Sequence, residues 1–508
     1  MSDTLRLEPN DRRTARRASG LLATFNQVGV LEAAEVHVAT RFGALAGETD
    51  DTVLLAVALA VRAARLGAVC VNLTTIADQD AELAELPWPD PERWAAAVGA
   101  SSLVTGIEVA GDQLGRSGTV LRLVPRPEGR LLYLDRHWRE EDQVCADLLA
   151  RLALVPPELE TPALEASADR LFGPGWAEQR DASVKATRQW TTVLTGGPGT
   201  GKTASVARML VLIAEQHELL HGRAPRIALA APTGKASARL EESVTREAAT
   251  LQPGDRSRLD GLRAGTLHRL LGWRPDSGTR FRHHRDNPLP YDVVVVDEVS
   301  MVSLPQMARL LEAVRPTTRL VLVGDPDQLA SVEAGAVLAD IVTGFTDRDS
   351  SPVARLTVPH RIRSAGGAAT GDLDELACAL RSGDADAAVA LLTSGSAHVR
   401  LVDPADEPAM AAVRAEIGDA AYRITERALA YDPVADPTGV TDLLDEHRLL
   451  CAHREGPYGV AGWNRQVERL VAERTGITHY DEWYAGRQVL ITANDRGLGI
   501  SNGDIGAV

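Results

Sequence analysis

Cysteines and aromatic residues are scarce in this sequence. Only 4% of its 508 residues are aromatic, and four are cysteines. Cys70, Cys145, Cys378 and Cys451 lie far apart and form no CxxC pair, which argues against a zinc or iron–sulfur site and against a disulfide framework. We expect all four to be ordinary thiols.

Long apolar runs are also missing. The longest, Thr52–Val61, lies between Asp51 and Arg62, and it is too short to cross a bilayer. It predicts a buried helix instead. The charged N-terminus has no apolar run after it, so it does not resemble a secretory signal. We therefore expect a cytoplasmic protein with no membrane partner.

The charge is one-sided, with a formal net charge of −16. This value argues against a uniformly basic surface that coats DNA. A local basic channel stays compatible with it, because phosphate binding depends on where Lys and Arg lie. The most visible basic clusters are Arg12–Arg17 and Arg280–Arg285, which are either DNA contacts or a solvated tail and loop.

From about residue 165 onward, short apolar runs alternate with amphipathic stretches such as 304–314. Strands buried on both faces and separated by helices are typical of a doubly wound parallel sheet, an α/β fold. Ligands of such sheets bind beyond the carboxyl ends of the strands. The runs, each followed by polar residues, are Thr191–Thr195, Ile227–Ala231, Val293–Val296 and Leu320–Val323.

The first 160 residues have a different pattern, rich in Ala, Leu and Val at helical spacing. Strand-like patches occur only at Gly118–Val124 and Arg130–Leu134, and prolines at 156, 157 and 162 then mark a linker. The sequence thus predicts a mainly helical N-terminal domain over residues 1–160.

Residues 196–203 read GGPGTGKT and match the P-loop pattern G-x-x-x-x-G-K-[ST]. Glycines let backbone N–H groups wrap phosphates, Lys202 reaches the β and γ phosphates, and the Thr203 hydroxyl holds Mg²⁺. The following helix points its positive end at the same anion. ATP and Mg²⁺ are therefore the expected cofactors. The predicted nucleotide-binding residues are Gly196, Gly197, Pro198, Gly199, Thr200, Gly201, Lys202 and Thr203.

Two further motifs follow apolar runs. Asp297 is expected to hold Mg²⁺ and Glu298 to orient or deprotonate the attacking water, although acidic pairs also cap strand ends. The P-loop and this pair alone would also fit an AAA-type ATPase. Residues 324–328 read GDPDQ, where Gln328 can touch the γ-phosphate and report its loss to DNA-binding loops; a simple β-turn is the alternative.

Together these motifs resemble superfamily-1 helicases. APTGKA at 231–236, GTLHRLLG at 265–272, DEVSM at 297–301 and GDPDQLASV at 324–332 resemble helicase motifs Ia, Ib, II and III. In this order they are similar to the RecD family, the alpha subunit of exodeoxyribonuclease V, the RecBCD helicase–nuclease. The resemblance is dense over 179–341 and looser over 356–361, 449–464 and 486–508. Residues 131–141 are similar to the family's N-terminal domain, which docks onto the gamma subunit.

The resemblance implies roles for individual residues. Gln179 stands where the family has a glutamine that reads adenine. Arg361 stands where a motif IV arginine reaches the γ-phosphate, with a surface arginine as the alternative. The residues expected along single-stranded DNA are Thr233, Lys235, Thr266 and His268. The two threonines equally suit helix caps, and the histidine equally suits a core or capping position.

Residues 273–290, between motifs Ib and II, carry aromatic and basic residues around a central Ser-Gly turn and predict a short hairpin. In the family a hairpin at this place helps to split the duplex.

The sequence departs from the family pattern at its end. The family continues past NGDIG, here 502–506, with motifs V and VI, whereas this sequence ends at Val508. We expect a further C-terminal part, because 486–508 reads as the start of a small β domain. Without that part the chain would bind ATP poorly or turn it over slowly. No nuclease constellation is visible, and in the family the nuclease lies on the beta subunit.

The resemblance implies two RecA-like motor domains with parallel sheets: 161–345, which carries the hairpin, and an incomplete 346–508. It implies an ATP-dependent 5′–3′ DNA helicase subunit that unwinds duplex ends with beta and gamma subunits in double-strand-break repair by recombination. The 5′–3′ polarity is implied by the resemblance to the family and by no residue of this sequence. The alternatives are a stand-alone RecD-like helicase and an assembly subunit with a vestigial or regulatory ATPase.

Overall fold

The computed structural model describes residues 11–78, 84–106, 119–274, 277–328, 334–346, 348, 350–358, 371–396, 398–432, 434, 439–477, 483–492, 498, 500 and 504–508. Its contacts divide the chain into two units. The first comprises Met1–Pro232 and Arg239–His360, and the second Thr233–Ala238 and Arg361–Val508.

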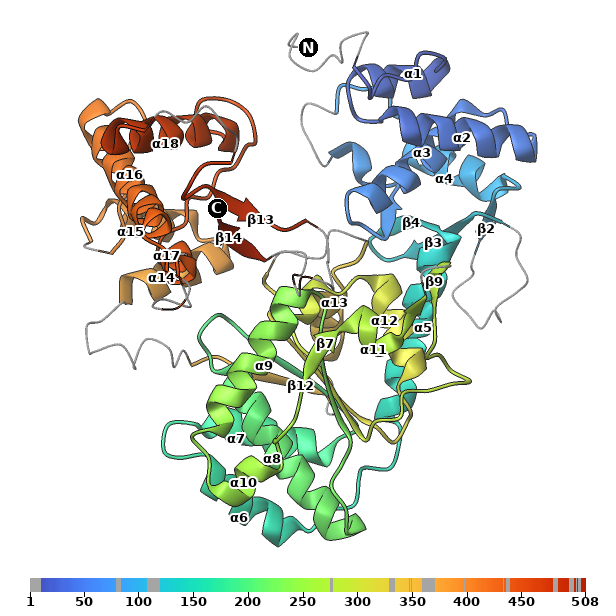
Figure 1. The fold of residues 1–508 in the computed structure, drawn as a ribbon. Helices are drawn as coiled ribbons and strands as arrows, with labels where there is room; N and C mark the ends of the chain where they lie inside the picture. The colour runs from blue at the N-terminus through green and yellow to red at the C-terminus, as the bar shows by residue number, and fades with distance from the viewer. Residues whose placement is uncertain are drawn as a thin grey trace. The chain divides into compact units, whose positions relative to one another are not determined.

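A six-stranded parallel sheet forms the centre of the first unit (Figure 1). Its strand order is β12-β5-β11-β10-β6-β7, and every neighbouring pair is parallel. All carboxyl ends therefore lie at one edge of the sheet. The four strands expected from the apolar runs are confirmed. The strands are β5 (Thr191–Gly196), β6 (Ile227–Ala231), β7 (Ala264–Thr266), β10 (Val293–Val296), β11 (Arg319–Gly324) and β12 (Val353–Leu356).

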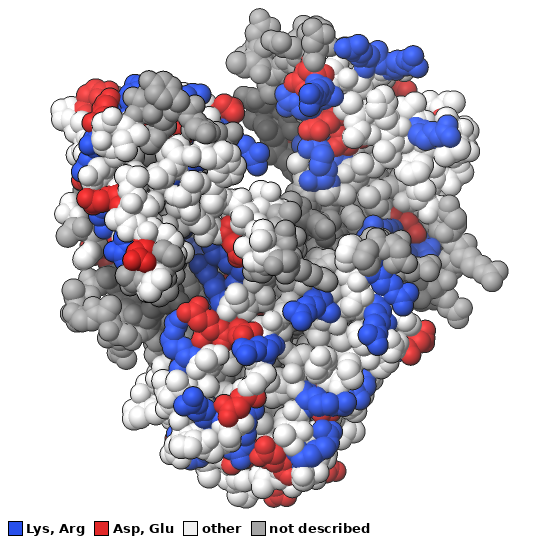
Figure 2. Space-filling view, viewed as in Figure 1, with Lys and Arg blue, Asp and Glu red and all other residues white. Residues whose placement is uncertain are grey.

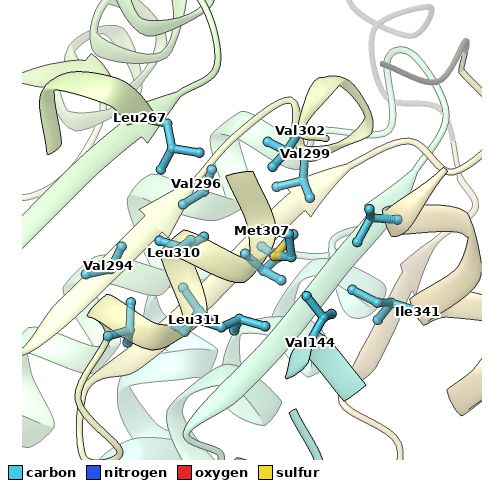
Figure 3. Close-up of a cluster of buried hydrophobic side chains, with 14 of the residues drawn as sticks. Val144, Leu267, Val294, Val296, Val299, Val302, Met307, Leu310, Leu311 and Ile341 are labelled. Atoms are coloured by element: carbon cyan, nitrogen blue, oxygen red, sulfur yellow. The ribbon is translucent and has the colours of Figure 1, made fainter. Parts of the chain in front are cut away.

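Helices cover both faces of this sheet, and β10 shows why its sequence is continuously apolar. Successive side chains of a strand point to opposite faces. Val294 and Val296 pack with α12 and its neighbours (Figure 3), whereas Val293 and Val295 pack with α8 on the other face. The helices are α5 (Asp135–Leu152), α6 (Thr161–Leu171), α7 (Ala177–Arg188), α8 (Lys202–His221), α9 (Gly234–Ala248), α10 (Pro253–Ser257), α11 (Leu267–Leu271), η3 (Val299–Met301), α12 (Leu304–Ala313) and α13 (Val337–Phe345).

The N-terminal part of the first unit has a hydrophobic core of its own. The run Thr52–Val61 lies in the buried helix α3, as predicted. A four-stranded sheet, ordered β1-β4-β3-β2, accompanies the helices, which make up most of this part, as the sequence predicts. Its elements are α1 (Gly20–Gln27), α2 (Ala33–Ala46), α3 (Asp51–Arg65), β1 (Cys70–Asn72), η2 (Ile76–Asp78), α4 (Pro91–Ala100), β2 (Val104–Gly106), β3 (Leu121–Arg126) and β4 (Gly129–Leu134).

The second unit is mostly helical in the part that the structure describes, with a small core of Met410, Ile417 and Trp463. No parallel strand pair occurs among its described residues, so a second RecA-like domain over 346–508 stays a prediction. Strands β13 and β14 pair antiparallel within the expected small β segment. The elements are α14 (Gly371–Ser382), α15 (Ala385–Thr393), α16 (Glu407–Leu429), α17 (Thr441–Glu446), α18 (Val460–Thr475), β13 (Gln488–Leu490) and β14 (Ile505–Ala507). No helix within the described ranges is long and apolar enough to span a bilayer.

Helix α5 was expected in the N-terminal domain, but Val144 and Leu148 pack into the core beneath the parallel sheet. Its Arg151 is buried, and four hydrogen bonds tie it to the segments that lead into β5 and β11. The acceptors are Thr191 Oγ1 (2.7 Å) and the carbonyls of Arg315 (2.8 Å), Trp190 (3.1 Å) and Thr318 (2.6 Å). Burial lowers the pKa of Arg151 to about 10.

We expect Arg151→Met to lower the free energy of unfolding by about 2 kcal/mol, because buried carbonyls lose their donors. Arg246→Met on α9 is the control. Arg246 and its partner Glu242 one turn away are both exposed, so the loss of this pair should change stability by less than about 0.5 kcal/mol. Urea unfolding measures both variants, and equal stability of Arg151→Met and the wild type would contradict the bracing role.

Candidate ATP site at the carboxyl edge of the sheet

Three motifs that lie far apart in the sequence meet at the carboxyl edge of the sheet. The P-loop follows β5, Asp297 follows β10, and residues 324–328 follow β11. These strands are neighbours in the order β5-β11-β10. The fold therefore brings the phosphate-binding loop, the acidic pair and motif III to adjacent positions.

The P-loop has the backbone geometry that its glycines predict. Gly199 and Gly201 have φ values of 80° and 81°, which residues that carry a Cβ atom rarely adopt. The Lys202 ammonium donates hydrogen bonds to the carbonyls of Gly196 and Gly197. The loop is thus shaped around the lysine, which, with Thr203, begins α8.

Gln179 is fully buried beside this loop. Its amide Nε2 donates to the Thr200 carbonyl at 3.0 Å, and its Oε1 has no hydrogen-bond partner among the described residues. In this structure Gln179 braces the P-loop. Adenine reading by Gln179 stays a prediction.

The pKa of Asp297 is raised to about 6, mainly by burial. The neighbouring Glu298 charge contributes to this rise, whereas the Glu298 amide, which donates to Asp297 Oδ1 at 2.9 Å, and the Lys202 charge oppose it. Because this folded-state pKa lies above the ordinary value, ionised Asp297 costs stability above pH 6, and the cost fades as the pH falls towards 4.

A desolvated carboxylate within reach of the P-loop Lys202 charge suits a divalent cation, whose charge favours the ionised form. Among the described residues no three His, Cys, Asp or Glu side chains cluster as a metal site. A Mg²⁺ ion would therefore depend on Asp297, Thr203, waters and the phosphates of the nucleotide, which is how Mg²⁺ is usually held.

Glu298 adopts φ 52°, and no other described non-glycine residue has a positive φ. This left-handed conformation costs about 1–2 kcal/mol for a residue with a side chain. Such strain persists where the surrounding structure enforces it, which is common at functional sites. It supports the expectation that Glu298 has a catalytic role.

Motif III touches motif II directly. Ser300 Oγ donates to Gln328 Oε1 at 3.2 Å, and a Cβ on Gly324 would lie 3.2 Å from the Val299 amide. Buried Asp325 accepts a bond from the Asp327 amide at 3.1 Å and so shapes the turn before Gln328. Sequence reasoning gave Ser300 and Asp325 no role, although the Asp-Pro-Asp order suggests such a turn.

The residues expected along DNA lie near strand ends. Thr266 and Thr233 accept bonds from the amides of Arg269 (3.2 Å) and Ala236 (3.1 Å), so both are helix caps. His268 is exposed, with its ring centroid 5.8 Å from that of Phe281, so a core position is wrong. Lys235 lies in the first turn of α9. Their DNA contacts stay predictions, and Arg361 lies outside the described residues.

The hairpin expected between motifs Ib and II is present. Strand β8 (Trp273–Arg274) pairs antiparallel with β9 (Ser277–Phe281). Ser277 and Gly278 belong to β9, so the expected Ser-Gly turn is wrong. Trp273 is 47% exposed.

Charged side chains of both signs are interspersed over the face of the molecule shown in Figure 2. Among the described residues of this face, Lys and Arg side chains form no continuous surface, as the net charge of −16 suggests. Strong attraction of phosphate over this whole face is therefore not expected, and DNA contacts must be local.

Comparisons with known proteins match two parts of the chain to family models. Residues 179–334 match an AAA domain, and residues 27–114 match the N-terminal domain of the RecBCD enzyme subunit RecD. The second match lies upstream of residues 131–141, on which sequence reasoning relied.

Curated relatives cover nearly the whole chain. The RecBCD enzyme subunits RecD of Mycobacterium tuberculosis and Mycolicibacterium smegmatis are each 54% identical, over 97% and 96% of this chain and 80% and 81% of their own lengths. The ATP-dependent RecD2 DNA helicase of Deinococcus radiodurans is 31% identical over 75% of this chain and 44% of its own.

Among solved structures, the Pif1 helicase from Candida albicans is 16% identical over 40% of this chain and 43% of its own, with a TM-score of 0.23. We draw nothing from a likeness this low.

Two substitutions of Glu298 separate its chemistry from its backbone strain. Both Glu298→Gln and Glu298→Gly should slow ATP hydrolysis about 100-fold or more, because the general base is lost. The glycine variant should also be more stable than the glutamine variant by up to about 1 kcal/mol, because glycine adopts positive φ freely.

Single-turnover ATPase and urea unfolding test both effects. Hydrolysis at the wild-type rate in Glu298→Gln would contradict the base role. Equal stability of the two variants would contradict the strain.

Proposed function

The chain belongs to the RecD family of RecBCD enzyme subunits and is an ATP-dependent DNA helicase subunit, and on this premise we propose how its site works and with which partners. The observation that carries the proposal is the meeting of three nucleotide-site motifs on the neighbouring strands β5, β11 and β10. A lone P-loop would bind phosphate. The added acidic pair and motif III make a site that hydrolyses ATP and senses the result.

We assign the chemistry as follows. The P-loop amides and Lys202 hold the phosphates, and Thr203 and Asp297 would hold Mg²⁺. Bound Mg²⁺ neutralises charge that develops on the transferred phosphoryl group. Glu298 orients the attacking water and accepts its proton. Gln328 detects the γ-phosphate, and its hydrogen bond to Ser300 ties this response to motif II.

Single-stranded DNA is the proposed track, gripped by backbone contacts and a few stacked bases. Thr233, Lys235, Thr266 and His268 are proposed to lie along it. Trp273 and Phe281 are the two candidate residues for stacking on the bases. Trp273 is the better one, because it is 47% exposed whereas Phe281 packs against the hydrophobic core.

We propose beta and gamma subunits as partners, with the N-terminal part docking onto the gamma subunit and the nuclease on the beta subunit. The match of residues 27–114 to the RecD N-terminal domain supports this assembly. A stand-alone helicase remains the second candidate because of the 31% identity to the Deinococcus RecD2 helicase. Co-purification of the untagged complex separates the two. The intact P-loop and acidic pair speak against a vestigial ATPase.

Lys202→Ala should reduce DNA-stimulated ATPase and the unwinding of 5′-tailed duplexes by about 100-fold or more, because the charge that binds the developing phosphate is lost. Arg246→Ala, an exposed charge paired with Glu242 on α9, is the control and should leave both rates unchanged. Undiminished activity of Lys202→Ala would remove the motor assignment. Preferred unwinding of 3′-tailed duplexes by the wild type would overturn only the proposed polarity.

The hairpin should matter for strand separation rather than for hydrolysis. Deletion of residues 276–287, which leaves Trp273 in place, should lower unwinding more than single-strand-stimulated ATPase. Leu219→Ala removes an exposed apolar side chain on α8 and serves as the control. Unwinding and ATPase assays on the same preparations decide, and an equal loss of both activities would sink the hypothesis.

A further inference from the structure

The segment that leaves the parallel sheet has an anchor that the reaction chemistry does not explain. Strand β12 ends at Leu356, and Thr357 and Val358 follow. The chain passes from the first unit to the second after His360. Thr357 and Val358 therefore begin the crossover between the two units.

Glu178, in the first turn of α7, accepts three hydrogen bonds from this short segment. The Thr357 amide donates to Oε2 at 2.7 Å, the Val358 amide to Oε2 at 3.1 Å, and the Thr357 hydroxyl to Oε1 at 2.5 Å. Both carboxylate oxygens are used, and bonds to a charged acceptor are about twice as strong as neutral ones. A single side chain thus fixes the start of the crossover.

The adjacent residue on α7 contacts the ATP site. Gln179 donates to the Thr200 carbonyl of the P-loop at 3.0 Å. One turn of α7 therefore holds the P-loop through Gln179 and the crossover through Glu178. Helix α7 lies beside β12 (Figure 1).

The end of β12 also touches the P-loop directly. Strands β5 and β12 pair so that Leu356 stands opposite Gly196, and a Cβ on Gly196 would lie 2.7 Å from the Leu356 carbonyl. Further along α7, Lys185 Nζ donates to the Val353 carbonyl at 2.6 Å. The P-loop, α7 and β12 therefore pack together, and the Glu178 carboxylate joins them to the start of the crossover.

We infer that Glu178 is a positioning residue that couples the nucleotide state of the P-loop to the crossover between the two units. When the P-loop changes with nucleotide, α7 moves with it through Gln179. Glu178 then carries that movement to Thr357 and Val358 at the start of the crossover. Without this clamp the site still binds and hydrolyses ATP, but less of each cycle is converted into movement along DNA. This inference rests on the proposed motor function.

The test compares Glu178→Ala with wild type as the full-length protein in its purified complex. ATP affinity and ATPase without DNA should stay within about twofold, because the three hydrogen bonds that Glu178 accepts from Thr357 and Val358 come from the crossover and not from the P-loop. DNA-stimulated ATPase should fall severalfold, and the ATP consumed per base pair unwound should rise at least twofold. Glu178→Gln keeps one carbonyl acceptor and should give an intermediate result.

Two further variants make the test specific. Glu165→Ala removes a carboxylate of α6 that pairs with Arg180 and Arg188 of α7 but does not bond to the crossover. The coupling ratio of this variant, the ATP consumed per base pair unwound, should therefore match that of the wild type. Thr357→Val removes only the hydroxyl donor and should raise the ratio less than Glu178→Ala does. Thr357→Ser keeps the hydroxyl donor, so its coupling ratio should equal that of the wild type.

An unchanged coupling ratio in Glu178→Ala would overturn the inference. A parallel loss of ATP affinity, DNA-free ATPase and DNA-stimulated ATPase would also overturn it, because that pattern indicates a general structural role. These outcomes differ from failure of the motor itself, in which the wild type would show no DNA stimulation of its ATPase.

Discussion

The parallel alignment of β5, β11 and β10 is the constraint on which the rest of the structure depends. Parallel neighbours place their carboxyl ends at one edge, so three loops from distant parts of the chain must converge there. Because both faces of the sheet are covered by helices, its central strands β10 and β11 are almost entirely apolar and cannot slip without exposing a core. A rigid sheet therefore holds a P-loop, an acidic pair and a sensing glutamine in fixed relation.

The site carries costs that this sheet must offset. Asp297 is a carboxylate in a desolvated position, and Glu298 holds a left-handed backbone conformation. Gln179 leaves a buried oxygen without a partner among the described residues. Each feature costs free energy in the protein alone, and a bound cation would offset the cost at Asp297 by favouring its ionised form. Contacts elsewhere in the fold offset this cost in stability. One example is Arg151 of α5, which donates hydrogen bonds to the segments that enter the sheet.

Sequence reasoning succeeded where local patterns determine structure. The valine run of β10 predicts a strand buried on both faces, and GGPGTGKT predicts the loop with glycines at positive φ. It failed where distant residues decide. The packing of α5 against α12, the bonds from Thr357 and Val358 to Glu178, and the burial of Gln179 join residues without a shared local signal. The hairpin shows both cases, since its existence was predictable but the place of its turn depended on strand register.

One edge of this sheet should respond as a unit to nucleotide. Amide hydrogen exchange with and without a non-hydrolysable ATP analogue and Mg²⁺ tests this response. We expect joint protection of residues 196–203, 297–301 and 324–328, with no change at 315–318, which lead into the opposite edge. Protection confined to the P-loop would contradict it.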